Sequence, residues 1–203
     1  MNRMMSTLLA TGALTVAGLP AFAEATANAT VDLNIRAGAG PAYDVVGVIP
    51  AGEEVVVTGC LEPATWCEVT SDGITGWASG GYLTAIVETT PVVIYENADA
   101  AGITTVTYDP TLPDGTVTLN GAVIAADPTG ETTSLEIEDN AITYLNDNPV
   151  EPIYLEGEVV VGAGLPETVV LTPIPESPMA YANVNGQIVM VQPETRRVTY
   201  IVR

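Results

Sequence analysis

The chain has 203 residues, enough for one or two small domains, and it carries 25 acidic residues against 5 basic ones, with no histidine. Its net charge of −20 excludes favourable binding to nucleic acid, anionic lipid or anionic wall polymers, because like charges repel. Hydrophobic residues make up 47% of the chain and the acids are scattered, which excludes a disordered acidic tail.

The first 23 residues predict a cleavable signal peptide. Arg3 supplies the positive start, an apolar run extends to about Leu19, and residues 21–23 read Ala-Phe-Ala, an A-x-A-type cleavage site. The apolar run is shorter than the roughly 18–20 residues that span a bilayer, and no cysteine follows it that could carry a lipid. We therefore expect a mature protein without a membrane anchor, periplasmic or secreted. Its negative charge is interpreted mainly as a means of staying soluble, with a dedicated acidic binding surface as the alternative.

Residues 24–30 are small and polar, and we expect them to form only a short leader. The sequence after them predicts a series of short strands. Residues 31–36 alternate apolar and polar side chains, as a strand with one buried face does. Further strands are expected at 45–49, 55–59, 66–69 and 74–78, with a last short segment at 82–83. Turns that contain Gly or Pro separate them. Five short strands in about sixty residues favour a small barrel over an open sheet.

Cys60 and Cys67 are the two cysteines of the chain and flank a predicted turn. In an exported protein, two cysteines at this spacing predict a disulfide bond. A metal site is the weaker alternative because the chain has no histidine. A redox-active pair is disfavoured because the spacing is not Cys-x-x-Cys.

A larger set of residues in this region resembles the bacterial SH3 domain. The segments are LNIRAGAGP at 33–41, Tyr43, VGVIPAG at 46–52, WCEV at 66–69, GWA at 76–78, and Tyr82-Leu83. They occur in order over residues 30–85, and we expect the domain to extend over 24–87. The resemblance implies an SH3-like barrel in a non-catalytic module of an exported or cell-wall-associated protein. Some members of that family bind peptidoglycan or its peptides.

Residues 103–138 and 168–203 align without a gap, which indicates a duplication. The alignment matches Asn120-Gly121 with Asn185-Gly186 and places several prolines at equivalent positions. Asn-Gly between apolar segments is a strong hairpin signal, so we expect two hairpins of the same geometry. We therefore expect a β-hairpin region over 88–151. The alternative is that two proline-rich segments are alike in composition alone.

The last part of the chain resembles a domain of unknown function, family 1236. The segments are GAGLP at 162–166, LTPIP at 171–175, NGQIV at 185–189 and QPETRRV at 192–198. The resemblance covers about 155–203, and we expect a compact β-rich C-terminal module over 152–203. It implies export in the company of bacterial SH3 domains, and no particular activity.

The residue types argue against catalysis. The mature chain has no histidine and no lysine, which removes the commonest general base, histidine-activated nucleophiles and Schiff-base chemistry. Glu136, Glu138 and Asp139 form the densest acidic cluster and are interpreted as a solvated strand face. Asp127 and Glu131 could contact calcium, but no EF-hand, phosphate loop or dinucleotide fingerprint is present. We expect no catalytic residue, no metal and no cofactor.

Tyr43, Asp44 and Tyr82 are the candidate ligand-binding residues. Tyr43 follows a glycine-rich turn, where loops commonly carry function, and packing in the core is the alternative for each tyrosine. Arg36 is isolated among acids. We expect it to form a structural ion pair with an acid of the barrel such as Asp44, with a ligand carboxylate as the alternative partner.

These patterns predict an all-β protein with an SH3-like barrel, β-hairpin segments and a compact β-rich C-terminal module. We expect a non-catalytic exported binding module that acts in the cell envelope, with peptidoglycan or its peptides as ligand. A protein–protein adaptor in the periplasm is the alternative, and a cell-wall hydrolase is a disfavoured one. Because the mature chain is almost free of positive charge, the ligand is expected to be neutral or cationic.

Overall fold

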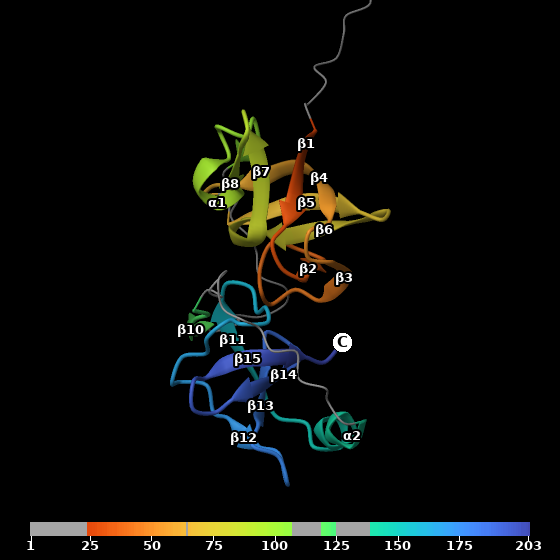
Figure 1. Cartoon of the computed structure of the whole chain (residues 1–203), viewed down its shortest axis with the longest axis vertical. Coiled ribbons are helices and arrows are strands. Elements are labelled where there is room, and N and C mark those ends of the chain that lie inside the picture. The colour runs from red at the N-terminus through yellow and green to blue at the C-terminus, as the bar shows by residue number, and fades with distance from the viewer. Residues whose placement is uncertain (1–23, 64, 107–118, 125–138) are drawn as a thin grey trace, which may run out of the picture.

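The computed structural model describes residues 24–63, 65–106, 119–124 and 139–203. They form two β-rich units that lie end to end along the long axis of the molecule (Figure 1). The first unit contains strands β1 to β9, and the second contains strands β10 to β15 and helix α2. The predicted all-β, SH3-like fold is confirmed.

The first unit is one largely antiparallel sheet. Its strands are β1 (Ala25–Ala29), β2 (Leu33–Arg36), β3 (Val45–Ile49), β4 (Glu54–Leu61), β5 (Trp66–Ser71), β6 (Ile74–Ser79), β7 (Leu83–Val87), β8 (Thr90–Val93) and β9 (Thr105–Val106). A 3-10 helix, η1 (Gly80–Tyr82), lies between β6 and β7, and a short helix, α1 (Ile94–Asn97), follows β8. Strands β2 to β6 coincide with the five predicted strands.

The strand order in this sheet is β3-β2-β6-β5-β4-β1-β7-β8, with β9 added in parallel beside β4. Among the described strands, this order runs from β3 to β8 and does not return to β3. The predicted barrel is therefore an open sheet that bends around its core rather than a ring of hydrogen-bonded strands. Strand β3 is left as an edge strand with β2 as its described partner.

Strand β1 lies in the segment that was expected to be only a leader, so that expectation is wrong. Its residues pair with β4, where Ala25 faces Val57, and with β7, where Ala29 faces Leu83. Ala27 and Ala29 are buried in the core of the unit. The alternation of small and polar residues was present in the sequence, but alanine has a weak strand preference and gives a weak signal.

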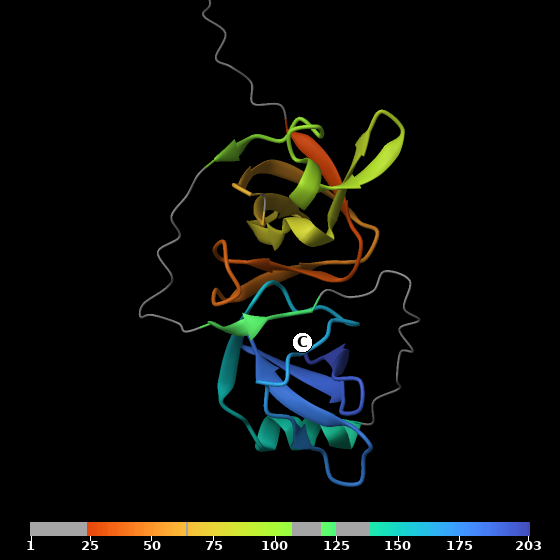
Figure 2. The same ribbon diagram turned by 90° about the vertical axis from the view of Figure 1, so that its left-hand side faces the viewer.

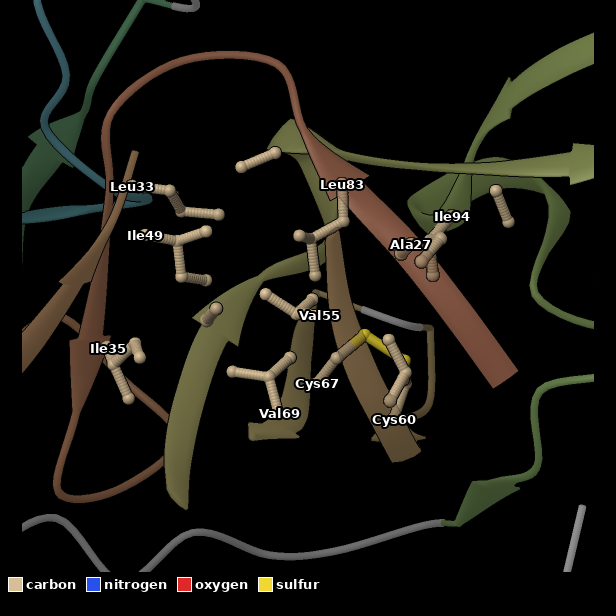
Figure 3. Packing of buried hydrophobic residues seen from close by; sticks show 14 of the residues in the cluster. Ala27, Leu33, Ile35, Ile49, Val55, Cys60, Cys67, Val69, Leu83 and Ile94 are labelled. Carbon is tan, nitrogen blue, oxygen red and sulfur yellow. A yellow bond between two sulfur atoms is a disulfide. The ribbon is translucent and has the colours of Figure 1, made fainter. Parts of the chain in front are cut away.

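Branched apolar side chains fill the space enclosed by this sheet (Figure 3). The labelled members include Leu33, Ile49, Val69 and Leu83, which come from different strands. Cys60 and Cys67 stand opposite each other on β4 and β5 and form a disulfide bond within the same core, with Cα atoms 3.9 Å apart. The predicted disulfide is confirmed.

The second unit is a smaller mixed sheet with one helix. Its elements are β10 (Leu119–Ala122), α2 (Asp139–Asp147), β11 (Pro152–Glu156), β12 (Thr172–Pro173), β13 (Ala180–Val184), β14 (Gln187–Gln192) and β15 (Arg197–Ile201). The order is β10-β11-β13-β14-β15, with β12 beside β13. Helix α2 was not predicted, and Asp139 begins this helix rather than lying on a strand. Leu145 of α2 packs on Tyr181 and Met190, which places the helix against β13 and β14 (Figure 2).

The two Asn-Gly steps have different structures, so the prediction of two equivalent hairpins is wrong. Asn185-Gly186 forms the tight turn between β13 and β14, with positive φ angles of 54° and 78°. Asn120-Gly121 instead lies within β10, which pairs in parallel with β11 and shifts register at this step. A glycine inside a strand often marks such an irregularity. The prolines at 110, 113 and 128 lie outside the described residues.

The disulfide is expected to be a main source of stability in the first unit. The cysteines are separated by 7 positions, and closing a loop of this size is worth about 2.5 kcal/mol in the chain-entropy model. We predict that the Cys60→Ser, Cys67→Ser double variant loses about that much free energy of unfolding, measured by urea denaturation. Wild-type protein under reducing conditions should show the same loss. Equal stability of the variant and the oxidised wild type would contradict the prediction.

The burial of Tyr181 leads us to expect that the second unit loses stability at alkaline pH. Burial, with a smaller contribution from Tyr144, raises the pKa of Tyr181 above its ordinary value of 10.0, and its hydroxyl donates a 2.7 Å hydrogen bond to the carbonyl of Asn148. Folding therefore favours the neutral phenol, so this stabilisation is present below the unfolded-state pKa and is lost as pH rises through the folded-state pKa. We expect Tyr181→Phe to cost about 1 kcal/mol at neutral pH and to weaken the alkaline loss. Tyr95→Phe, at an exposed position, should change neither quantity.

Candidate functional site

A groove of about 740 Å³ lies where the two units meet. Its first wall comes from the loop before β3 and from β3 itself, and its second wall comes from β11, the β13–β14 turn and the last residues of the chain. The lining residues are Ala42, Tyr43, Asp44, Val45, Gly47, Val48, Tyr154, Asn185, Gly186, Gln187, Ile188, Val202 and Arg203.

Tyr43 and Asp44, two of the predicted ligand-binding residues, both line this groove. Tyr43 is half-buried, and its ring lies so close to Gly38 that a Cβ atom added to Gly38 would come within 2.5 Å of the ring. The glycine-rich loop therefore folds against the tyrosine ring. Asp44 is exposed, and its backbone carbonyl accepts a hydrogen bond from the N–H of Ala37. Tyr43 thus combines packing of the loop with a place in the groove wall.

Tyr82, the third predicted residue, does not line the groove. It ends η1, and its carbonyl accepts hydrogen bonds from the N–H and the hydroxyl of Thr30. Its half-buried side chain packs against the core of the first unit. The structure therefore brings Tyr43 and Asp44 together and places Tyr82 in a different environment.

Arg36 is completely buried beneath the groove loop, and its predicted pairing with Asp44 is wrong. It forms an ion pair with Glu158, which follows β11 in the second unit: Nε donates to Oε2 at 2.5 Å and Nη2 donates to Oε1 at 2.7 Å. Nη1 donates to the carbonyls of Pro41 at 3.1 Å and Tyr43 at 2.7 Å. The guanidinium therefore joins the groove loop to the second unit. An ion pair was predicted correctly in kind, but its partner lies 122 positions away.

Buried amides complete the contact around Glu158. Asn34 donates through Nδ2 to Oε1 of Glu158 at 2.9 Å and to Oε1 of Gln187 at 3.0 Å. The N–H of Val159 also donates to Glu158. Asn34 was missed because polar residues that alternate with apolar ones on a strand ordinarily face water. Glu158 follows β11 and Gln187 begins β14, and no local pattern indicated that either would contact β2. The one available signal was an isolated arginine on that polar face.

The other described arginines also contact protein oxygens. Arg196 donates to the carbonyls of Leu165, Pro166 and Val169, and Arg197 donates to the carbonyl of Gly162. Arg203, at the rim of the groove, forms an exposed ion pair with Asp32 at 3.4 Å. In the described residues, the positive charges therefore hold the chain in place, and the acids dominate the exposed charge.

The groove offers polar and aromatic side chains for binding contacts. Its described lining provides one carboxylate, one guanidinium, two amides and two phenols. Within the described ranges, no three side chains of His, Cys, Asp or Glu are grouped so that they could hold a metal ion. Asp127, Glu131, Glu136 and Glu138 lie outside these ranges. In the same part of the chain, no helix has the length and apolar character needed to cross a membrane.

Comparisons with known families agree with this division of the chain. Residues 31–84 match the model of the bacterial SH3 domain, and residues 144–203 match the model of a domain of unknown function, DUF1236. No curated protein and no solved structure matches the chain significantly. The groove therefore has one wall in each matched segment, and the chain contains a bacterial SH3 domain followed by a DUF1236 domain.

Proposed function

We propose that the protein is a non-catalytic binding module of the cell envelope and that it binds peptidoglycan or its peptides. The observation that carries the proposal is the groove of about 740 Å³ in which the SH3 domain presents Tyr43 and Asp44. A bacterial SH3 domain suggests a module that binds cell wall or protein. An aromatic ring and a carboxylate beside an edge strand are contacts that suit a short peptide with a free amine.

Export of the protein is supported by two features of the SH3 domain. The Cys60–Cys67 disulfide fits an oxidising compartment such as the periplasm or the extracellular medium. Strand β1 begins at Ala25, immediately after the signal-peptide cleavage site expected at Ala23. Cleavage there would remove the signal peptide and leave the whole strand in the mature protein. We therefore propose a periplasmic or secreted location.

The charge of the protein supports a neutral or cationic ligand. Loss of Arg3 with the signal peptide would take the net charge from −20 to −21, and the remaining arginines contact protein oxygens. An anionic polymer meets a field of the same sign, whereas an amine is attracted. Added salt is expected to weaken the binding of a cationic peptide.

A protein–protein adaptor is the second candidate function. Val45 and Val46 on β3 are 37% and 45% exposed, and Ile74 on β6 is 39% exposed. Exposed apolar side chains beside an edge strand suit a protein partner. A cell-wall hydrolase is disfavoured, because bacterial SH3 domains are generally binding modules. A zymogram on cell-wall substrate tests that third class directly.

We predict that Asp44→Asn weakens binding of the full-length mature protein to purified sacculi. The exposed carboxylate contributes about 0.5–1 kcal/mol to an ion pair with a ligand amine, which corresponds to a two- to fivefold loss of affinity. Thermal stability should stay unchanged because the side chain is exposed. Tyr43→Ala is less informative, because removing the ring also removes packing against Gly38.

Asp72→Asn is the matched control, because Asp72 is an exposed acid in the β5–β6 turn, away from the groove lining. It removes the same charge and should leave sacculus binding unchanged. An equal loss of sacculus binding in both variants would show that the net charge of the protein, rather than the groove carboxylate, determines the affinity. Capture of an envelope protein by a wild-type chain that does not bind sacculi would favour the adaptor.

A further inference from the structure

The ion pair between Arg36 and Glu158 connects the DUF1236 domain to the loop that carries Tyr43 and Asp44. One side of the guanidinium faces Glu158, and Nη1 faces the carbonyls of Pro41 and Tyr43. We propose that Glu158 is a positioning residue for the SH3 groove, and that the DUF1236 domain is the second half of the ligand site. This inference rests on the proposed function of the groove.

The geometry of arginine explains how the position of Glu158 reaches the loop. A guanidinium is planar, and its donors project in fixed directions. Nε and Nη2 both donate to the carboxylate of Glu158, which fixes the plane and therefore the direction of Nη1. Pro41 and Tyr43 accept from Nη1, so the backbone next to the groove is held in one place.

Burial makes this link depend on the DUF1236 domain. Arg36 is 0% exposed and Glu158 is 1% exposed, so each charge relies on the other in place of water. A buried guanidinium without its counter-charge is strongly unfavourable. Without Glu158, we expect Arg36 to leave its site and release the two carbonyls of the loop. The conformation of the SH3 loop then depends on a residue outside the SH3 domain.

The turn between β13 and β14 both contacts the SH3 domain and lines the groove. Gln187 accepts a hydrogen bond from Asn34 of β2, and Asn185, Gly186 and Gln187 are part of the groove wall. The side chain of Asn185 accepts from the N–H of Leu155 and donates to the carbonyl of Gly157. These contacts fix the turn relative to β11, the strand that precedes Glu158. The buried contacts of Asn34 and Arg36 therefore reach both walls of the groove.

The test uses the full-length mature protein and two readouts. The first readout is the affinity for purified sacculi and for a soluble stem peptide with a free amine. The second is the set of NMR signals from the backbone amides of Gly38, Gly40 and Asp44. Glu158→Gln should weaken binding about tenfold, shift these signals and lower the thermal midpoint. Glu194→Gln removes the same charge from an exposed position of the DUF1236 domain, and it should change neither readout.

A second variant separates positioning from stability. The double change Arg36→Met, Glu158→Met replaces the buried pair by apolar side chains, which commonly preserves or raises stability. We expect a thermal midpoint above that of Glu158→Gln, because no buried charge is left unpaired. The affinity should still be about tenfold weaker and the loop signals still shifted, because Nη1 no longer holds the loop. Wild-type affinity or unshifted loop signals in this folded variant would overturn the inference.

The experiment also distinguishes a wrong ligand assignment from a wrong role for Glu158. If the wild-type chain binds neither sacculi nor the stem peptide, the ligand assignment is wrong, and the loop signals of the two Glu158 variants still decide whether Glu158 sets the loop. Shifted signals in both variants would support the link, and unshifted signals would reject it.

Discussion

The ion pair between Arg36 and Glu158 is the fully buried charged contact that joins the two domains. A buried guanidinium loses its hydration, and this loss is offset only by a well-placed counter-charge together with full hydrogen bonding. Glu158 supplies the charge, and the carbonyls of Pro41 and Tyr43 accept the hydrogen bonds of Nη1. Breaking such a pair typically costs about 3–5 kcal/mol, whereas the intact pair contributes little net stability. We therefore expect its main effect to be the selection of one orientation of the domains.

The same pair helps to explain the electrostatics of the whole protein. Arg36 is neutralised inside the molecule, and Arg196 and Arg197 cap backbone carbonyls of the DUF1236 domain. Arg203 pairs with Asp32 at the surface. Few positive charges are then left to compensate the 25 acids, so a ligand approaches a negative field. The expected sign of the ligand therefore follows from the excess of acids, and the arginines contact protein oxygens.

Local patterns in the sequence predicted most strands of the SH3 domain. They could not predict contacts between residues that are far apart in the chain. Strands β2 to β6 and the disulfide could be predicted because alternation, turn residues and cysteine spacing are local properties. The Asn-Gly signal was correct at Asn185-Gly186 and wrong at Asn120-Gly121, because the partner strand, rather than the dipeptide, decides whether a hairpin forms. Tyr43 and Asp44 were named from the loop alone. The opposite wall, formed by residues more than a hundred positions away, had no local signal.

Strand β2 shows why the partner of Arg36 could not be predicted. An antiparallel strand with alternating apolar and polar residues ordinarily buries one face and leaves the other in water. In β2, Leu33 and Ile35 fill the core of the SH3 domain, while Asn34 and Arg36 are covered by the DUF1236 domain, so all four residues are buried. Val160 of the DUF1236 domain also packs into the core cluster of the SH3 domain. The polar face of β2 is therefore an interface between domains, and its arginine is the residue that requires a specific partner there.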